Sequence, residues 1–415
     1  MSQIKLYQGS IASRIERLQK AGVLHADTAS QLFALMPAAW SNYANHWIEN
    51  AIGYWPMPLG IANDIPVNDQ ILMLPLAVEE TSIIAGLCKM GKLVRQHGQL
   101  KTQHHRTIAK GQIPFKGVTL TQHQIDQLKQ NMPTWIGMAN TQIVPGLHRR
   151  GGGLLKINWV IKDHWLIIEF ELDPCDAMGA NLVNQVAEFL KPKLEACLDA
   201  TATTAILSNL TPVRASASIT LSGLSAAHAK RIADASEWAQ VDSGRAATHN
   251  KGIFNGIDAL CIATGNDWRA VNAAGHAYAA RNGQYQGLST WSYHDDQLHG
   301  KLALPIPIGT VGGVTRQHPI AQLSLDVLGQ PNADQLAQYM VACGLLQNLA
   351  ALYALTSDGI VSGHMRLHIN NLIQPYSLNQ QQSLLLKALC EAHLERTGAI
   401  TATDVKHLYR NMHHD

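Results

Sequence analysis

The chain has 415 residues, of which 46% are hydrophobic, and its formal net charge is only +2. This length allows two or three domains with sizeable cores, and the composition argues against a disordered chain and against a nucleic-acid-binding chain. Six scattered cysteines without a CxxC pair exclude a disulfide framework and indicate reduced thiols, mostly in core positions.

The first hundred residues predict short helices, a proline-rich segment and a strand that leads into a helix. Apolar residues at helical spacing predict two short helices before residue 36. Prolines within residues 49–67 exclude a continuous helix there and indicate loop and edge-strand structure. Residues 74–78 suit a short buried strand, after which Ser82 can cap a helix over residues 83–93.

No apolar signal region and no run of about 18 apolar residues is present, so we expect a cytoplasmic protein without a membrane span.

The segment that follows predicts a small α+β insert. Residues 154–160 and 165–171 have the pattern of paired strands, and residues 179–198 that of a helix. This helix follows the sequence DAMGAN, where free backbone N–H groups could hold a phosphate-bearing cofactor. A plain helix cap is the simpler explanation of DAMGAN taken by itself. Because no GxGxxG follows a strand in the expected context, the insert is not a Rossmann domain.

The sequence RAATHNKGIFNGIDALCIATGNDWRA, residues 245–270, concentrates polar and ionisable residues among small ones. Its glycines indicate turns or a close approach of the backbone to a ligand, and the apolar run 257–263 suggests a buried strand. Lys251 and Asp267 bracket this run, which suggests an ion pair removed from water. The alternative is a purely structural salt bridge.

Towards the C-terminus, residues 309–313 predict a flexible turn, residues 334–355 a buried helix, and residues 379–415 a small polar helical appendage. His364 and His368 lie four positions apart at a predicted helix start. Without an HExxH pattern or a nearby cysteine, they do not predict a metal site.

Six segments resemble, in order, the class II hydroxymethylglutaryl-CoA (HMG-CoA) reductases, the soluble form found in bacteria and archaea. They are ENAIGYWPMPLGIA (49–62), PLAVEETS (75–82), DAMGANLVN (176–184), the block around THNKGIFNG and TGND (245–281), GTVGGVTRQHP (309–319) and GHMRLH (363–368). The resemblance implies an α+β fold with a discontinuous large mixed helix/strand domain for substrate binding and dimerisation, residues 1–106 and 209–357. It also implies an inserted small ferredoxin-like, non-Rossmann cofactor-binding domain, residues 107–208, and a mobile helical lid, residues 358–415.

The resemblance further implies reduction of HMG-CoA to mevalonate and free CoA by two hydrides, or the reverse oxidation, without a metal. Lys251 would stabilise the oxyanion and Glu80 would donate a proton. Asp267 would tune Lys251 and link it to Glu80, while His364 would travel on the lid and protonate the CoA thiolate. The substrate would be bound by Glu49, Ser82, Arg245 and Asn255. Arg245 suits the free carboxylate, which a guanidinium can bind with two parallel hydrogen bonds.

The resemblance also implies a homodimer or higher homo-oligomer with its active sites at the dimer interface. From the low net charge and the absence of a long apolar run we expect no nucleic-acid or membrane partner. The implied cofactor-binding residues of the small domain are Asp176, Met178, Gly179, Asn181 and Asn209. NADH-specific members of the family carry an acidic residue shortly before the glycine run of this domain, where this chain has Arg149 and Arg150. These arginines favour NADPH, although NADH remains possible and a solvated basic turn is the alternative.

Two other functions fit parts of the sequence. One is a CoA-thioester-binding protein or acyltransferase without reductase activity, and the other is a metallohydrolase that uses the histidines. The joint presence of Glu80, Lys251, Asp267 and His364 favours the reductase.

Overall fold

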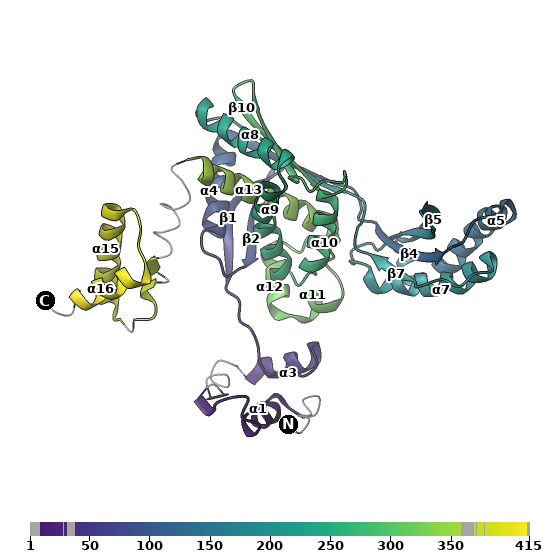
Figure 1. The fold of residues 1–415 in the computed structure, drawn as a ribbon, viewed down its shortest axis with the longest axis horizontal. Coiled ribbons are helices and arrows are strands. Elements are labelled where there is room, and N and C mark those ends of the chain that lie inside the picture. The colour runs from purple at the N-terminus through teal and green to yellow at the C-terminus, as the bar shows by residue number, and fades with distance from the viewer. Residues whose placement is uncertain are drawn as a thin grey trace. The chain divides into compact units, whose positions relative to one another are not determined.

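The computed structural model describes residues 9–27, 29–30, 38–357, 369–370, 372–376 and 378–412. Contacts divide the chain into two compact units, Met1–Pro58 and Leu59–Asp415 (Figure 1). The first unit contains α1 (Ile11–Lys20), where Ser10 caps the helix, and α3 (Ala38–Trp47). A small core centred on Ile11 and Ile15 holds it together. The second predicted N-terminal helix, around residues 32–35, falls outside the described residues.

The larger body of the second unit is built on two antiparallel sheets. A hairpin of β1 (Leu59–Val67) and β2 (Gln70–Ala77) forms the smaller sheet. The other sheet has the strand order β3-β8-β10-β9. Its strands are β3 (Gly98–His104), β8 (Ala215–Leu221), β9 (Ser289–His294) and β10 (Gln297–Leu304). Buried and part-buried residues alternate along β8, as expected for a strand with one face on the core.

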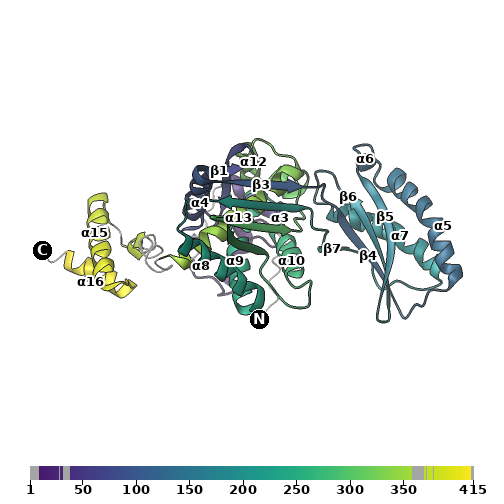
Figure 2. The same cartoon turned by 90° about the horizontal axis from the view of Figure 1, so that it is seen from above.

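Helices pack on these sheets and enclose one large apolar core. They are α4 (Ile83–His97), α8 (Ala226–Val241), α9 (Ser243–Ala263), α10 (Trp268–Ala279), α11 (Gly313–Gln317), α12 (Pro319–Val327) and α13 (Ala333–Thr356). α13 runs beside the four-stranded sheet and also contacts α4 and α9 (Figure 2). The predicted strand before Glu79 and the helices predicted over residues 83–93 and 334–355 are confirmed.

α13 has the length and composition of a membrane-spanning helix, although it contains no uninterrupted run of about 18 apolar residues. Among the described residues it is the one such helix, and 67% of its most apolar window is buried inside the protein. Apolar residues occur all round a helix that packs against a sheet on one side and helices on others. The burial of α13 in the core therefore accounts for its composition.

The prediction of a strand over residues 257–263 is wrong, because these residues form the second half of α9. A short apolar run cannot distinguish a buried strand from a buried helix, and the glycines before it suggested a loop. Gly252 and Gly256 instead lie within the helix. A Cβ at Gly256 would approach Cys343 Sγ of α13 to 2.9 Å, so the missing side chain allows the two helices to pack closely.

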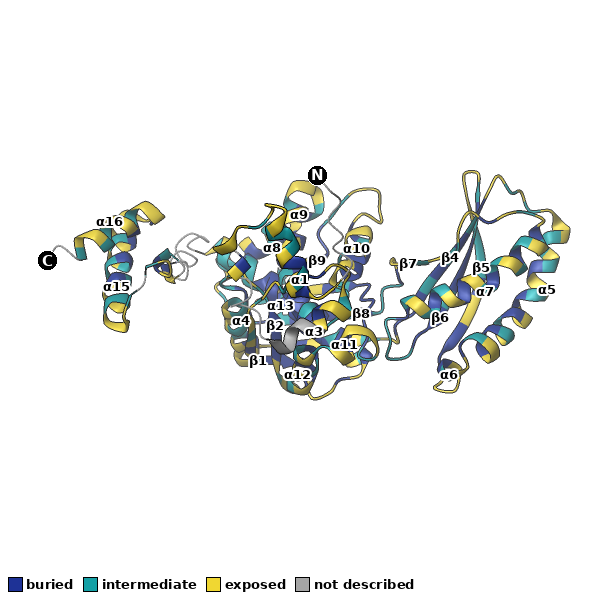
Figure 3. Cartoon of the chain, turned by 90° about the horizontal axis from the view of Figure 1, so that it is seen from below, coloured by how far each residue is buried: buried dark blue, intermediate teal, exposed yellow. Residues whose placement is uncertain are grey.

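Residues 109–208 form a body with its own apolar core. The chain order is strand, helix, two strands, helix and strand, and the antiparallel sheet has the order β5-β6-β4-β7. Its main elements are β4 (Ala109–Lys116), α5 (Gln122–Met138), β5 (Gly153–Lys162), β6 (Trp165–Asp173), α7 (Ala180–Leu198) and β7 (Ile206–Ser208). The buried faces of α5 and α7 pack on one side of this sheet (Figure 3). The predicted strand pair and the helix after DAMGAN are confirmed.

The C-terminal residues of the chain form α15 (Gln380–Thr397) and α16 (Ala402–Met412), which share a small core around Leu386 and Val405. This agrees with the predicted helical appendage. His364 and His368 lie outside the described residues.

Candidate active site

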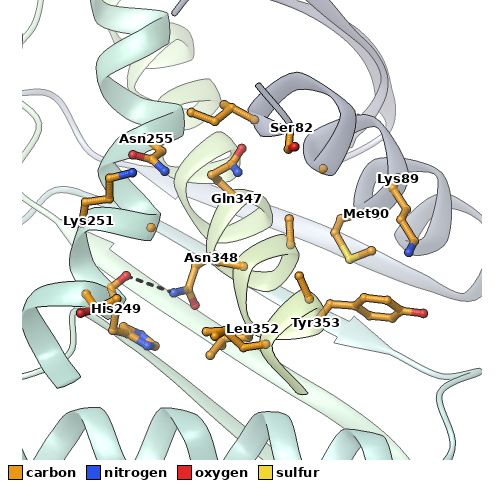
Figure 4. A pocket seen from close by; sticks show the side chains of 18 of the residues that line it. Ser82, Lys89, Met90, His249, Lys251, Asn255, Gln347, Asn348, Leu352 and Tyr353 are labelled. Carbon is orange, nitrogen blue, oxygen red and sulfur yellow. Dashed lines mark hydrogen bonds between the residues drawn. The ribbon is translucent and has the colours of Figure 1, made fainter. Parts of the chain in front are cut away.

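A pocket of about 650 Å³ lies between the start of α4, the first half of α9 and the C-terminal half of α13 (Figure 4). Five residues that the sequence singled out line it. They come from two segments, the junction of β2 with α4 and the polar face of α9, and they are Glu80, Ser82, Arg245, Lys251 and Asn255. The fold thus brings together residues that the sequence separates by more than 160 positions.

Lys251 forms an ion pair with Glu80 at the mouth of this pocket. Lys251 Nζ lies 2.8 Å from Glu80 Oε2, and their side chains are 59% and 45% exposed. A pair this exposed contributes only about 0–1 kcal/mol to folding. Both groups are therefore accessible to a ligand, and the pair adds an ammonium donor and a carboxylate at one point of the pocket wall.

Arg245 lies six residues before Lys251 on α9, with its guanidinium carbon 5.8 Å from the centre of the Trp238 ring. Burial lowers the pKa of the Arg245 guanidinium. Ser82 occupies the position before α4 with a left-handed backbone, φ 76°, and its hydroxyl does not cap the helix. The prediction of a serine cap is wrong because this backbone does not have the extended conformation that a capping side chain needs.

Asp267 lies beyond the C-terminal end of α9, at the start of α10. Its carboxylate caps α10 by accepting from the backbone N–H groups of Arg269 and Ala270, and it lies 3.2 Å from Arg269 Nε. Ala263, the last residue of α9, lies twelve positions after Lys251, which is about 18 Å along the helix axis. The predicted buried pair of Lys251 with Asp267 is therefore wrong within a single chain, where the lysine pairs with Glu80 instead.

The DAMGAN segment joins β6 to α7. Asp176 Oδ1 accepts a hydrogen bond from the Ala333 backbone N–H, 3.0 Å away, at the first turn of α13. A Cβ at Gly309 would lie 2.5 Å from Met178 N, so the turn of GTVGG contacts this segment. Gly179 precedes α7 with φ 94°, and no side chain caps that helix. Asn181 and Asn209 are exposed.

The basic turn of Arg149 and Arg150 lies beside the same segment. Both residues follow the short helix α6 (Pro145–His148) and are exposed. The Arg150 carbonyl oxygen is 3.8 Å from Cys175 Sγ, one residue before Asp176. The fold thus brings the basic turn to the segment that precedes the uncapped end of α7.

Comparison with known proteins identifies the family. The profile of hydroxymethylglutaryl-coenzyme A reductase matches residues 10–369. The 3-hydroxy-3-methylglutaryl-coenzyme A reductase of Archaeoglobus fulgidus is 34% identical over 376 residues, which are 88% of this chain and 85% of that protein. The chain belongs to this family.

Solved structures agree. The class II HMG-CoA reductase of Streptococcus pneumoniae, bound to NADPH in open conformations, is 34% identical with a TM-score of 0.73, over 86% of this chain and all of that one. A second structure of the reductase from that organism is 32% identical with a TM-score of 0.74, over 99% of this chain and all of that one. This chain is accordingly an HMG-CoA reductase of class II, with the mixed α/β architecture of those structures.

Three residues of the reductase pocket carried no assigned role in the sequence. His249 of α9 and the pair Gln347 and Asn348 of α13 line its inner wall. Gln347 and Asn348 are adjacent polar residues in the most apolar part of a helix, 5% and 1% exposed. A polar pair inside an otherwise apolar helix was the signal that could have identified them.

Two predicted residues are not placed in this pocket. Glu49 is exposed and follows α3 in the unit Met1–Pro58, and His364 lies outside the described residues. In the described part of the reductase, no group of three or more histidine, cysteine, aspartate or glutamate side chains could hold a metal ion.

Proposed function

We propose that the chain reduces HMG-CoA to mevalonate and CoA with NADPH, and that the pocket at Lys251 and Glu80 is its active site. The observation that carries the proposal is the 2.8 Å pair of Lys251 and Glu80 in a pocket shared with Arg245, Ser82 and Asn255. A cation, a proton donor and a guanidinium are the groups that a carboxylate-bearing thioester needs when its carbonyl is reduced.

The body of residues 109–208 fits the role of a ferredoxin-like cofactor domain. Its chain order and sheet order are those of a split βαβ fold. The uncapped first turn of α7 leaves backbone N–H groups for a phosphate. We assign the 2′-phosphate to Arg149 and Arg150, because the Arg150 backbone contacts Cys175, which directly precedes Asp176. Bound there, the nicotinamide cofactor supplies the hydride for each reduction step.

The chain's own residues then hold and polarise the substrate. Lys251 donates hydrogen bonds to the carbonyl oxygen as negative charge develops on it. Glu80, already in contact with Lys251, gives the proton that completes reduction of the aldehyde. Arg245, with Ser82 and Asn255, binds the free carboxylate, and His364 protonates the departing CoA thiolate from the C-terminal lid.

Asp267 and Glu49 enter this scheme through a second copy of the chain. Since Asp267 lies beyond the C-terminal end of α9, where it caps α10 and pairs with Arg269, we assign it to the Lys251 of a partner subunit in a homodimer. Glu49 would approach the substrate at the same interface. The pocket of one chain would then be completed by the other.

The proposal is tested by incubating the purified chain with HMG-CoA and NADPH in the presence of a chelator. We expect loss of the near-ultraviolet absorbance of the reduced nicotinamide, with two cofactors oxidised for each mevalonate and each CoA released. CoA release without cofactor oxidation would indicate a hydrolase or acyltransferase instead. Activity that disappears with the chelator and returns with a metal would indicate metal-dependent chemistry.

A further inference from the structure

His249 is a buried side chain in the wall of the active-site pocket, and one of its two ring nitrogens forms no hydrogen bond with a described residue. It is 2% exposed, and it lines the pocket from α9 (Figure 4). Its Nδ1 is buried and has no hydrogen-bond partner among the described residues. A buried polar atom without a partner costs about 1–3 kcal/mol, so its presence beside a ligand pocket needs an explanation.

The other ring nitrogen is fixed by a chain of hydrogen bonds. Asn348 Oδ1 accepts from Ser289 Oγ at 2.8 Å and from the Trp291 indole N–H at 2.7 Å. The single hydroxyl proton of Ser289 is therefore used, and Ser289 Oγ accepts from His249 Nε2, 2.6 Å away. Burial lowers the pKa of His249 to about 4, so the ring is neutral at pH 7. The proton is on Nε2, and Nδ1 is a bare acceptor.

The orientation of the imidazole ring points Nδ1 away from β9, the strand whose Ser289 bonds Nε2. A Cβ at Gly287 would lie 3.4 Å from His249 Cδ2, so that edge of the ring faces residues 287–289. Nδ1 is on the opposite edge. Asn348 Nδ2 also donates to the His249 backbone oxygen at 3.4 Å, which holds the residue from the α13 side.

The donor that best matches this acceptor is the guanidinium of Arg245. Arg245 lies one helical turn before His249, so the two side chains share a face of α9. The positive charge of Arg245 contributes to the lowered pKa of His249. Among the described residues the guanidinium lies over the Trp238 ring and donates a hydrogen bond to no side chain or carbonyl oxygen. A guanidinium has five N–H donors, and a carboxylate takes two of them, which leaves donors for His249.

The neighbouring donors on α9 are already engaged. Lys251 donates to Glu80, and the Thr248 hydroxyl lies 3.5 Å from the Gly244 carbonyl oxygen. These side chains cannot take the place of Arg245 without giving up a partner.

We propose that His249 is a positioning residue whose Nδ1 accepts a hydrogen bond from Arg245 and fixes the guanidinium for the free carboxylate of the substrate. The inference rests on the proposed function, in which Arg245 binds that carboxylate. Ser289 and Asn348 contribute by holding the imidazole in the tautomer that can accept from Arg245.

Two substitutions of His249 distinguish the contribution of Nδ1 from that of Nε2. His249→Asn places an amide oxygen near the position of Nδ1, whereas His249→Gln reaches towards Ser289 and leaves Nδ1 unreplaced. Loss of one charge-assisted hydrogen bond predicts that His249→Gln raises the KM for HMG-CoA about tenfold, with kcat little changed. His249→Asn should recover part of this loss.

A double-mutant cycle with Arg245→Met decides whether the effect passes through the arginine. We expect His249→Gln to leave the KM of the Arg245→Met enzyme unchanged, and an equal increase in both backgrounds would overturn the inference. If Arg245→Met alone leaves the KM unchanged, the proposed carboxylate site is wrong and the inference falls with it. Thermal melting shows whether each variant is folded. Should His249→Gln not fold, Ser289→Ala, which releases the tautomer, must raise the KM in the Arg245 background only.

Discussion

Lys251 Nζ lies 2.8 Å from Glu80 Oε2, although the two residues are 171 positions apart in the chain. Lys251 is in the middle of α9, and Glu80 stands between β2 and α4. The contact joins the PLAVEETS and THNKG motifs of the sequence in the wall of one pocket. It defines the point where we expect the reacting carbonyl of HMG-CoA to lie.

Glu80→Gln removes the proposed proton donor while keeping the size of the side chain. We expect kcat to fall by about 10²–10⁴ for both HMG-CoA and mevaldehyde, since general acid catalysis contributes about that much. Steady-state oxidation of NADPH measures both substrates. The neighbouring Glu79, which is exposed, supplies the matched control, and Glu79→Gln should keep wild-type turnover. Equal losses in the two variants would remove Glu80 from its assigned role.

Asp267 should act on the Lys251 of a partner subunit. We expect Asp267→Asn and Lys251→Ala to be inactive separately, and co-expressed mixtures of the two to recover activity. A mixed dimer then has one site with both residues intact, so random pairing restores about a quarter of the wild-type rate. Differently tagged subunits allow the mixed dimer to be purified and assayed. No recovery in a purified mixed dimer would place both residues in the site of one chain.

The basic turn should select the cofactor. Arg149→Ala combined with Arg150→Ala is expected to raise the KM for NADPH several-fold and to leave that for NADH unchanged, because only NADPH carries the 2′-phosphate. The effect should shrink as salt rises, since both side chains are exposed. Lys162→Ala, an exposed change on β5, is the control. An equal response of the two cofactors would show that the turn is only a solvated surface.

His249 and Asp258 should make stability depend on pH in opposite directions. Burial lowers the pKa of His249 from 6.5 to about 4, so its unfolded form binds a proton first and stability falls as pH falls from about 6.5 to 4, by about 3 kcal/mol in all. Burial raises the pKa of Asp258 from 3.8 to about 6, against the hydrogen bond from Asn272. Its contribution is present below about pH 4 and is lost as pH rises through 6.

Chemical unfolding between about pH 4 and pH 7 measures both effects by comparing each variant with the parent. The advantage of the parent over His249→Gln should shrink towards acid, and its advantage over Asp258→Asn should shrink towards neutral pH. A difference from the parent that is constant across this range would contradict the burial assigned to that group.

The sequence predicted local structure well where turn and cap residues interrupt it. The strand before Glu79 and the paired strands predicted over residues 154–160 and 165–171 follow from prolines, glycines and alternation, which act over a few residues. The strand predicted over residues 257–263 was wrong because the glycine at position 256 reflects close packing of α9 on α13 and does not mark a turn. Helix and strand propensities describe single residues and cannot predict a contact with another helix.

The sequence predicted which residues belong to the site, but it did not predict which of them contact one another. Motif resemblance selected Glu80, Lys251 and Arg245, and the fold brings them to one pocket. That Lys251 meets Glu80 rather than Asp267 depends on the length of α9 after the lysine. The role of His249 depends on Ser289 and Asn348, which lie 40 and 99 positions further along the chain than His249 and come together with it only in the folded protein.

Replacement of Lys251 tests the proposed mechanism most directly. NADPH oxidation by folded Lys251→Ala should be at least about 10²–10³-fold slower than wild type with HMG-CoA and with mevaldehyde, because the donor to the developing oxyanion is lost in both steps. Lys301→Ala, an exposed change on β10, should keep the wild-type rate on both substrates. Near wild-type turnover by a folded Lys251→Ala enzyme would contradict the assignment of Lys251 and Glu80 as the centre of the reaction.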